Sequence, residues 1–358
     1  MAKWCFNVFK EEVNKGMNKI DNNLDNEIMV SVVCLAYNHE DYIRDCLEGF
    51  ISQKTDFKFE VIVHDDASTD DTALIISQYA EKNRGIIKPI LQKENQRRLK
   101  GVFILSDYIS KEIKGKYVAL CEGDDFWTDK YKLQKQFDAL ENNPQCKLCL
   151  HKVNVINTNG EGMGYSHPDY EIETGLIKST DFIRIVCQKY TFQTSSYFFN
   201  SNEYIKYIMN YPRFKRVISV GDEPYLLYFG QLSDVYYINE ALSNYRKGGA
   251  SSWSTLYAVS SEKKIKNAEQ HIAMFNEYDK YTNYKYHDSC EIGKEKYEYL
   301  IALNNFNPKI LLNKRYKKFL KTESLKTRIF VYSMIVLHSL KKKINKGELK
   351  NNEKKNSN

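Results

Sequence analysis

The sequence predicts an α/β protein, with a Rossmann-like sheet flanked by helices and a helical, basic C-terminal extension. Two patterns lead to this prediction. Short apolar runs alternate with amphipathic segments up to about residue 143, which is typical of βαβ units. From about Thr255 the pattern is helical and rich in Lys. With 42% hydrophobic and 13% aromatic residues, the 358-residue chain has enough apolar material for a large core.

The first two strands and helices follow from the hydrophobic pattern. Met29–Ala36 is a short, nearly continuous apolar run, which predicts a strand covered on both faces, and Phe59–Val63 is similar. After the second strand, Ser68–Asp71 predicts a helix start. Between the strands, apolar residues recur at the spacing of an amphipathic helix, namely Ile43, Cys46, Leu47, Phe50 and Ile51.

The alternation continues with Ile86–Gln92, a strand expected at the sheet edge because Pro89 interrupts it. We expect a helix over Val102–Ile113, a strand over Tyr117–Cys121 and a helix over Leu133–Leu140. Beyond this point the pattern is less regular. It predicts a helix near 179–188, an aromatic strand around 190–199 and a helix opened by Gly-Asp-Glu-Pro at 221–224.

The net charge of +7 is unevenly distributed. Lys309–Asn358 holds fifteen Lys or Arg and three Glu, a charge of +12, so the preceding 308 residues carry −5. A mildly acidic body is unsuited to general phosphate binding, which argues against nucleic acid as a partner. Acidic residues stand where a secretory signal would be apolar, and no run reaches the roughly 18 apolar residues needed to span a bilayer. We therefore expect a cytoplasmic protein.

Three predicted strands end in residues suited to ligand binding, at 36–38, 65–68 and 122–125. The carboxyl ends of strands in an open α/β sheet meet at one edge, so an aromatic ring and two acidic clusters should lie together. Carboxylates repel a diphosphate unless Mg²⁺ or Mn²⁺ lies between them, so the clusters suggest a metal-bridged phosphate compound. Taken singly, each cluster also fits a turn or a helix cap. Neither G-x-G-x-x-G nor a P-loop motif is present, which disfavours dinucleotide dehydrogenases and P-loop NTPases.

Over about Met29–Ser254, five ordered segments resemble the family 2 glycosyltransferases, which have the GT-A fold: VSVVCLAYNHEDYIRDCLEGFISQ, FEVIVHDDASTDDT, GKYVALCEGDDFW, VGDEPYLLYFG and YRKGGASSWS. The resemblance implies a nucleotide-sugar donor and a divalent metal, Mn²⁺ or Mg²⁺. Tyr37 would stack on the base, and Asp65 and Asp66 would contact base and ribose. Asp124 would bind the metal as the last residue of a D-x-D motif. Glu122 departs from that motif, which usually has Asp at this position. Glu keeps the negative charge on a longer side chain.

The full set of donor-binding residues expected from this resemblance is Ala36, Tyr37, Asn38, Asp65, Asp66, Arg98, Glu122, Gly123, Asp124 and Arg246, with Asp124 and Glu122 as metal ligands. Arg97 and Arg98 follow the third strand, where the family often has a basic residue near the phosphates, and solvated charge is the alternative. Tyr245–Gly249 resembles a flexible segment that brings Arg246 over the diphosphate. A plain glycine-rich hinge is the alternative there.

Inverting transfer needs a carboxylate to take the proton of the acceptor hydroxyl. Asp222 is the expected base, since it lies in a segment that matches the family's acidic motif at a helix start. Glu223 is the second candidate, because another alignment of the motif moves the role by one residue. An N-cap function for Asp222 before Pro224 is a third interpretation.

The resemblance also implies a division of the chain. We expect an N-terminal extension, a GT-A domain with a nucleotide-binding and an acceptor half, a helical region and a disordered tail, at residues 1–28, 29–254 (29–150 and 151–254), 255–345 and 346–358. No sequence pattern indicates an oligomeric state.

An apolar stretch at 329–340, flanked by Arg328 and Lys341–Lys343, is too short to span a bilayer. It predicts attachment to an anionic membrane surface at the inner face of the cytoplasmic membrane. Docking on the body or on another subunit is the alternative. The function predicted is a metal-dependent, inverting transfer of a sugar, from a donor expected to be UDP-linked, to a glycan or lipid-linked acceptor in capsule, O-antigen or lipooligosaccharide synthesis. A nucleotidyltransferase and a noncatalytic glycan- or membrane-binding module are the alternatives.

Overall fold

The structure, a computed structural model, describes residues 27–100, 105–189, 192–249, 260–311 and 313–337. Several sequence predictions fall wholly or partly outside these ranges. They are the N-terminal extension, the first residues of the helix at 102–113, the start of the strand at 190, the end of the main domain at 250–254, the basic residues at 341–343 and the tail at 346–358. The division of the chain into domains stays a prediction.

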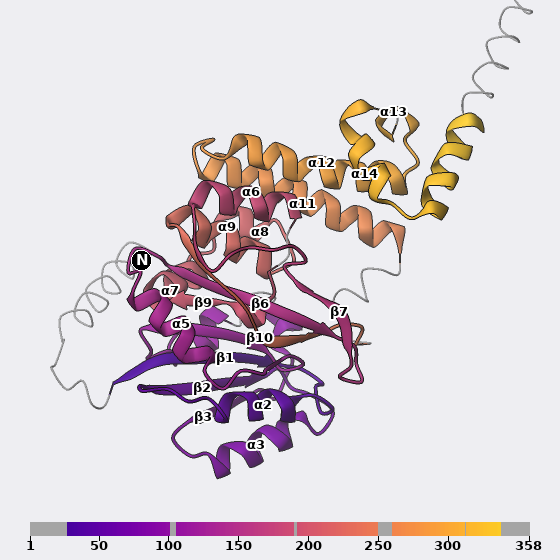
Figure 1. The fold of residues 1–358 in the computed structure, drawn as a ribbon. Coiled ribbons are helices and arrows are strands. Elements are labelled where there is room, and N and C mark those ends of the chain that lie inside the picture. The colour runs from indigo at the N-terminus through magenta and orange to yellow at the C-terminus, as the bar shows by residue number, and fades with distance from the viewer. Residues whose placement is uncertain (1–26, 101–104, 190–191, 250–259, 312, 338–358) are drawn as a thin grey trace, which may run out of the picture.

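The described strands form one mixed sheet in the order β3–β2–β1–β4–β9–β6–β10–β5, with β7 beside β6 and β8 beside β10 (Figure 1). β1 to β4 are parallel to one another, so their carboxyl ends meet at one edge. β9 lies antiparallel between β4 and β6. The strands are β1 (Ile28–Ala36), β2 (Lys58–Asp65), β3 (Ile87–Leu91), β4 (Tyr117–Glu122), β5 (Phe126–Trp127), β6 (Leu148–Ile156), β7 (Gly162–His167), β8 (Gly175–Ile177), β9 (Phe198–Asn200) and β10 (Val235–Arg246).

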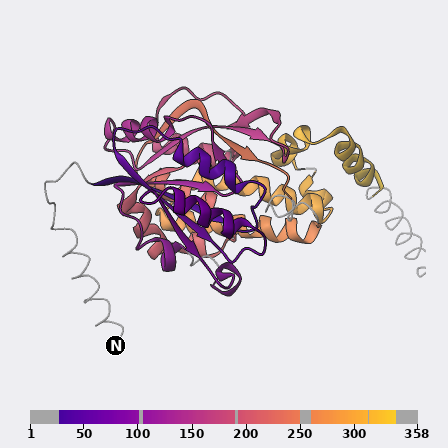
Figure 2. The same ribbon diagram turned by 90° about the horizontal axis from the view of Figure 1, so that it is seen from below.

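Helices cover both faces of this sheet. Figure 2 shows α2 and α3 lying along the part of the sheet formed by the first strands. The helices are α2 (Ile43–Ile51), α3 (Thr72–Lys82), α4 (Gln96–Lys100), α5 (Lys132–Glu141), α6 (Ser179–Lys189), α7 (Ser201–Met209), α8 (Arg213–Arg216), α9 (Asp222–Leu232), α11 (Ser261–Tyr281), α12 (His287–Asn304), α13 (Pro308–Leu311) and α14 (Lys317–Thr322).

Successive residues of β1 enter different cores because side chains alternate across a strand. Val32 and Cys34 belong to a core that includes α2, α3 and α5. Val33 belongs to a core shared with α6, α7, α9, α11 and α12. All three side chains are buried, as the apolar run in the sequence predicts. The helical region after residue 260 therefore shares a core with the sheet.

Two predicted elements differ from the structure. In place of the helix at 102–113, the described part contains a π-helical turn at Leu105–Ile109, in which Ser110 N–H donates to the Leu105 carbonyl. Ile109 is the residue of this turn that is fully buried, so little packing supports a longer helix. In the strand expected at 190–199, the Ser196 backbone N–H donates to the Gln193 carbonyl and closes a 3₁₀ turn, to which the Ser196 hydroxyl adds a second bond, and pairing begins only at Phe198.

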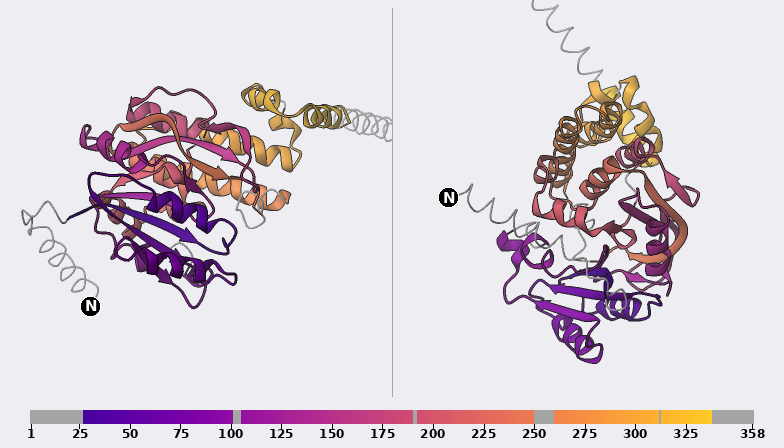
Figure 3. Two further views of the ribbon diagram at one scale, coloured as in Figure 1. Left: turned by 60° about the horizontal axis from the view of Figure 1, so that its bottom comes forward. Right: turned by 90° about the vertical axis from the view of Figure 1, so that its left-hand side faces the viewer.

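Residues 325–337 form a further helical segment at the outer edge of the molecule, here called the C-terminal apolar helix (Figure 3). Val331 is buried in a small cluster with Tyr316 and Leu320. The helix leaves six large apolar side chains exposed, namely Leu325, Ile329, Phe330, Tyr332, Val336 and Leu337. Within the described residues, no helix is long and apolar enough to cross a membrane.

Candidate active site

The end of β1 is tied to the loop after β2. Asn38 N–H donates to the Ser68 hydroxyl at 2.9 Å, and Thr69 N–H donates to Asn38 Oδ1 at 2.8 Å. Asn38 has a φ of 55°, a left-handed conformation that Asn tolerates better than most residues. Ala36 is buried and accepts a hydrogen bond from Asp66 N–H. Tyr37 is 41% exposed, so its ring is free to receive a flat ligand.

Asp65 and Asp66 are both buried within the loop that follows β2. Asp65 accepts hydrogen bonds from the backbone N–H and the hydroxyl of Ser68. Asp66 accepts from the N–H groups of Gln96 and Arg97 at 2.7 and 3.1 Å, and so caps α4. Each carboxylate has lone pairs beyond these bonds. The two residues thus shape the loop as well as lying at the predicted sheet edge.

The β4 end carries the predicted metal ligands. Glu122 is exposed and Asp124 is about 25% exposed at its side chain. Between them, Gly123 packs so closely that a Cβ would lie 2.8 Å from His39 Nδ1. His39 Nε2 lies 3.9 Å from Asp124 Oδ2. Sequence analysis did not single out His39, although it follows directly on Tyr37 and Asn38.

Three carboxylates from two parts of the chain interact here. The protein around the Glu122 carboxylate removes much of its hydration and raises its pKa to about 8, although solvent still reaches the side chain. The charge of Asp124 and then that of Asp222 contribute to this rise, and Arg97 opposes it. The structure therefore brings the start of α9 into electrostatic range of the end of β4.

Asp222 is the first residue of α9, and its side chain is half-buried. Burial raises its pKa to about 6; the charge of Glu223 adds to the rise, and backbone hydrogen bonds and the charge of His271 oppose it. Glu223 is 1% exposed, with Oε2 3.2 Å from His271 Nε2. Of the two candidate bases, Asp222 is the one whose charge helps to raise the pKa of Glu122.

Arg246 lies where β10 ends, and its guanidinium is held by the protein itself. Nε donates to the Asp124 carbonyl at 3.1 Å, and one terminal nitrogen donates to Asp45 at 3.1 Å. Its backbone N–H donates to Asp125 Oδ1 at 2.9 Å. The guanidinium also lies over the Tyr42 ring, 4.5 Å from its centroid. At 5% exposed, Arg246 braces the loop that carries Asp124.

Among the basic residues after β3, Arg98 is exposed on α4, whereas Arg97 acts on Glu122. A further cation, Lys215, is buried next to α9 and was missed because no motif marks it. Its Nζ donates to the carbonyls of Ile218 and Val220. Burial, together with the charge of Arg97, lowers the pKa of Lys215 to about 8. Lys215 thereby holds the segment that leads into Asp222.

The acidic residues provide the oxygen ligands that Mg²⁺ and Mn²⁺ prefer. In the part of the chain that the structure describes, no three His, Cys, Asp or Glu side chains lie close enough to hold a metal by themselves. Glu122 and Asp124 could each supply a carboxylate, and the remaining positions would be filled by water or by a ligand's phosphates. This arrangement suits a cation that binds together with a substrate.

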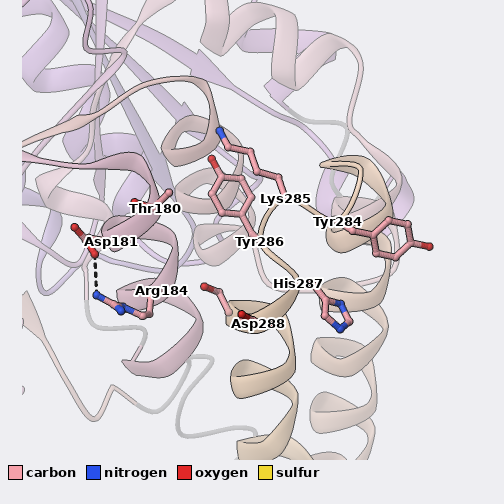
Figure 4. A pocket seen from close by; sticks show the side chains of 9 residues that line it. Thr180, Asp181, Arg184, Tyr284, Lys285, Tyr286, His287 and Asp288 are labelled. Atoms are coloured by element: carbon pink, nitrogen blue, oxygen red, sulfur yellow. Dashed lines mark hydrogen bonds and ion pairs between the residues drawn. The ribbon is translucent and has the colours of Figure 1, made fainter.

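The described residues line two hollows of similar size. One of about 450 Å³ lies between the start of α6 and the turn joining α11 to α12, and the Asp181–Arg184 ion pair stands at its wall (Figure 4). It contains none of the predicted site residues. The other, of about 430 Å³, is lined by Asp45 and by Arg246, which is a predicted site residue.

Comparison with known proteins identifies the family of residues 31–207. Residues 31–207 match the model described as "Glycosyl transferase family 2". An uncharacterized protein of Mycobacterium tuberculosis is 44% identical over 131 residues, 37% of each chain. The putative teichuronic acid biosynthesis glycosyltransferase TuaG of Bacillus subtilis is 36% identical over 112 residues, 31% of this chain and 42% of TuaG. The matched region thus covers less than half of these relatives.

Solved structures support the fold. S. aureus TarS 1–349 in complex with UDP-GlcNAc has a TM-score of 0.53 at 19% identity, covering 84% of this chain and 78% of that one. The mannosyltransferase PcManGT from Pyrobaculum calidifontis, in complex with GDP-Man and Mn²⁺, has a TM-score of 0.53 at 14% identity, covering 92% and 87%. Residues 31–207 therefore form a glycosyl transferase family 2 domain, and the chain has the GT-A fold.

Proposed function

We propose that the protein is a metal-dependent, inverting glycosyltransferase that moves a sugar from a nucleotide-sugar donor to a glycan or lipid-linked acceptor. The observation that carries this proposal is that Asp222 at the start of α9 lies within electrostatic range of Glu122 at the end of β4, as Asp124 does. One acidic group suits a divalent cation and a diphosphate, and the other suits a base. The exposed Tyr37 ring adds a surface for the nucleotide base.

The roles are divided as follows. Asp124 and Glu122 would hold Mg²⁺ or Mn²⁺, which when bound offsets the charge of the departing diphosphate. Asp222 accepts the proton of the acceptor hydroxyl while that oxygen bonds to the anomeric carbon. The bond from that carbon to the nucleoside diphosphate breaks in the same step, and the configuration inverts because the acceptor attacks the opposite face.

Names of similar proteins support a UDP-sugar donor and a surface polysaccharide as the product. An Escherichia coli relative, 33% identical over 113 residues, is named a UDP-Glc glucosyltransferase acting on a diphosphoundecaprenol-linked sugar. TuaG is assigned to teichuronic acid biosynthesis, and TarS binds UDP-GlcNAc. We therefore propose a role in capsule, O-antigen or lipooligosaccharide synthesis. The Mn²⁺ in the PcManGT complex supports a metal here as well.

A thermal-shift screen of nucleotide sugars with Mn²⁺ or with a chelator tests this function. A UDP-sugar at 100 times its Kd would add about 2.7 kcal/mol to the free energy of unfolding and raise Tm by several degrees. We expect this rise in Tm only in the presence of the metal. We also expect slow release of UDP from the UDP-sugar under the same condition. Stabilisation by nucleoside triphosphates instead would indicate a nucleotidyltransferase. Binding of a nucleotide sugar without release of UDP under any condition would indicate a noncatalytic module.

We also propose that the protein is cytoplasmic and that the C-terminal apolar helix attaches it to the anionic inner face of the cytoplasmic membrane. Leu325, Ile329, Tyr332 and Val336 recur at helical spacing on one exposed side. Each basic side chain near such a surface adds about 1 kcal/mol before screening. Exposed basic residues nearby include Lys314, Lys317, Lys321 and Lys326, while Arg315 and Lys318, also exposed, pair with Glu295. A lipid-linked acceptor would lie at the same surface.

Charging this helix should detach the protein from lipid. We expect the double variant Ile329→Glu, Val336→Glu to sediment at least about tenfold less with phosphatidylglycerol–phosphatidylcholine vesicles, since each side chain loses roughly 1.5 kcal/mol or more of burial. The control is Leu74→Glu, which charges an equally exposed apolar residue on α3. Binding of the double variant equal to that of the wild type would place the helix in a protein interface instead.

A further inference from the structure

The buried carboxylate beside the proposed base has its partner in the helical region after residue 260. Glu223 lies in the first turn of α9 and His271 lies in α11, and both residues are beyond the matched residues 31–207. His271 Nε2 and Glu223 Oε2 are 3.2 Å apart, and the two residues are 5% and 1% exposed. A carboxylate buried this deeply needs a compensating charge, because an unpaired one costs several kcal/mol.

The hydrogen bonds of His271 decide its protonation. Nδ1 lies 2.7 Å from the Asn267 carbonyl, which can only accept, so Nδ1 carries a proton. Nε2 lies 3.2 Å from Glu223 Oε2, within ion-pair distance. Burial alone would lower the pKa of His271, but Glu223 outweighs burial and the pKa rises. Both the geometry and the neighbouring carboxylate thus favour the imidazolium form of His271.

The surroundings hold this imidazolium in place. Its ring stacks on Tyr297 of α12 at 4.2 Å between centroids and 18° between planes. Nearby, α11 and α12 pack tightly at Gly293, where a Cβ would lie 2.8 Å from the Phe275 ring and 3.2 Å from the Cys187 carbonyl of α6. His271 thus projects from a rigid pair of helices toward the start of α9.

We propose that His271 is a positioning residue for glycosyl transfer. It pairs with Glu223 and anchors the first turn of α9, so that Asp222 alone presents a free carboxylate to the acceptor. The inference rests on the proposed function, because it assumes that Asp222 is the base. It gives the helical region after residue 260 a part in the active site.

The test is a cycle of variants with donor turnover measured in the presence of an acceptor. His271→Ala is expected to lower kcat roughly tenfold with little change in the KM for the donor, because α9 rather than the nucleotide site is disturbed. The same change in an Asp222→Asn background should have no further effect, since His271 acts through Asp222. Adding Glu223→Gln to His271→Ala should restore part of kcat, because a neutral amide needs no counter-charge.

His287→Ala is the matched control. His287 pairs with Asp279 at 2.7 Å in the same helical region. We expect the His287→Ala variant to have the kcat of the wild type. If His271→Ala fails to fold, His271→Phe keeps a ring to stack on Tyr297 without an N–H donor toward Glu223 and serves in its place. Wild-type kcat in either His271 variant, or an equal loss in the Asp222→Asn background, would overturn the inference. Unchanged turnover in Asp222→Asn alone would instead overturn the assignment of the base.

Discussion

We expect Asp222→Asn to lower turnover by roughly 10²- to 10⁴-fold while leaving the affinity for the donor nearly unchanged. The amide cannot take the proton of the acceptor hydroxyl, and we propose that the nucleotide binds at other residues, Tyr37 and the end of β4. Turnover with a saturating acceptor and donor binding by calorimetry would measure the two effects separately.

Glu223→Gln is the matched control for this change, one residue farther along α9. Because Glu223 is 1% exposed and paired with His271, its effect on turnover is expected to be much smaller. A larger loss in Glu223→Gln than in Asp222→Asn would assign the base to Glu223. If neither change slowed transfer, the product's anomeric configuration by NMR would show whether a retaining mechanism operates.

The second large effect is expected at the end of β4. Asp124→Asn should abolish transfer and remove the dependence of UDP binding on Mn²⁺, because an amide is a far weaker ligand for a hard cation than a carboxylate. Calorimetry of UDP binding with and without Mn²⁺ gives the metal effect directly, independently of turnover.

Asp129→Asn provides a control, since Asp129 lies on the same chain segment but pairs with Lys135 at 2.9 Å. It should retain the full metal effect. An undiminished Mn²⁺ dependence in Asp124→Asn would move the ligand to Glu122, because Asp125 is buried and accepts from Arg246.

Apart from the region of the helix expected at 102–113, the main strands and helices before residue 143 were predictable because each follows from a local hydrophobic pattern. The apolar run that became β1 and the helical spacing that became α2 depend on neighbours a few residues away. β10 was harder to recognise, since its pairing with β6 shifts register near Ala241 and breaks the alternation of buried and exposed residues.

The candidate site residues that could be predicted are those that directly follow a strand or begin a helix. Asp124 and Asp222 could be named in this way, although their roles are still predictions. The surroundings of these residues could not be named. Arg246 lies shortly before two glycines, a pattern that suggests a mobile segment. In the structure, however, its guanidinium donates a hydrogen bond to Asp45 on α2. No spacing in the sequence links Glu223 to His271, because the contact exists only once α11 packs beside α9.

The pairing of Glu223 with His271 has a consequence for how the protein is made. During synthesis α9 leaves the ribosome before α11, so the nascent chain holds Glu223 for a time without its counter-charge. Burying that carboxylate without a counter-charge costs several kcal/mol. We therefore expect the first turn of α9 to adopt the geometry described here only after α11 has been synthesised and has packed beside it. A chain truncated before residue 271 would therefore keep residues 31–207 and Asp222, but the first turn of α9 would lack the residue that pairs with Glu223.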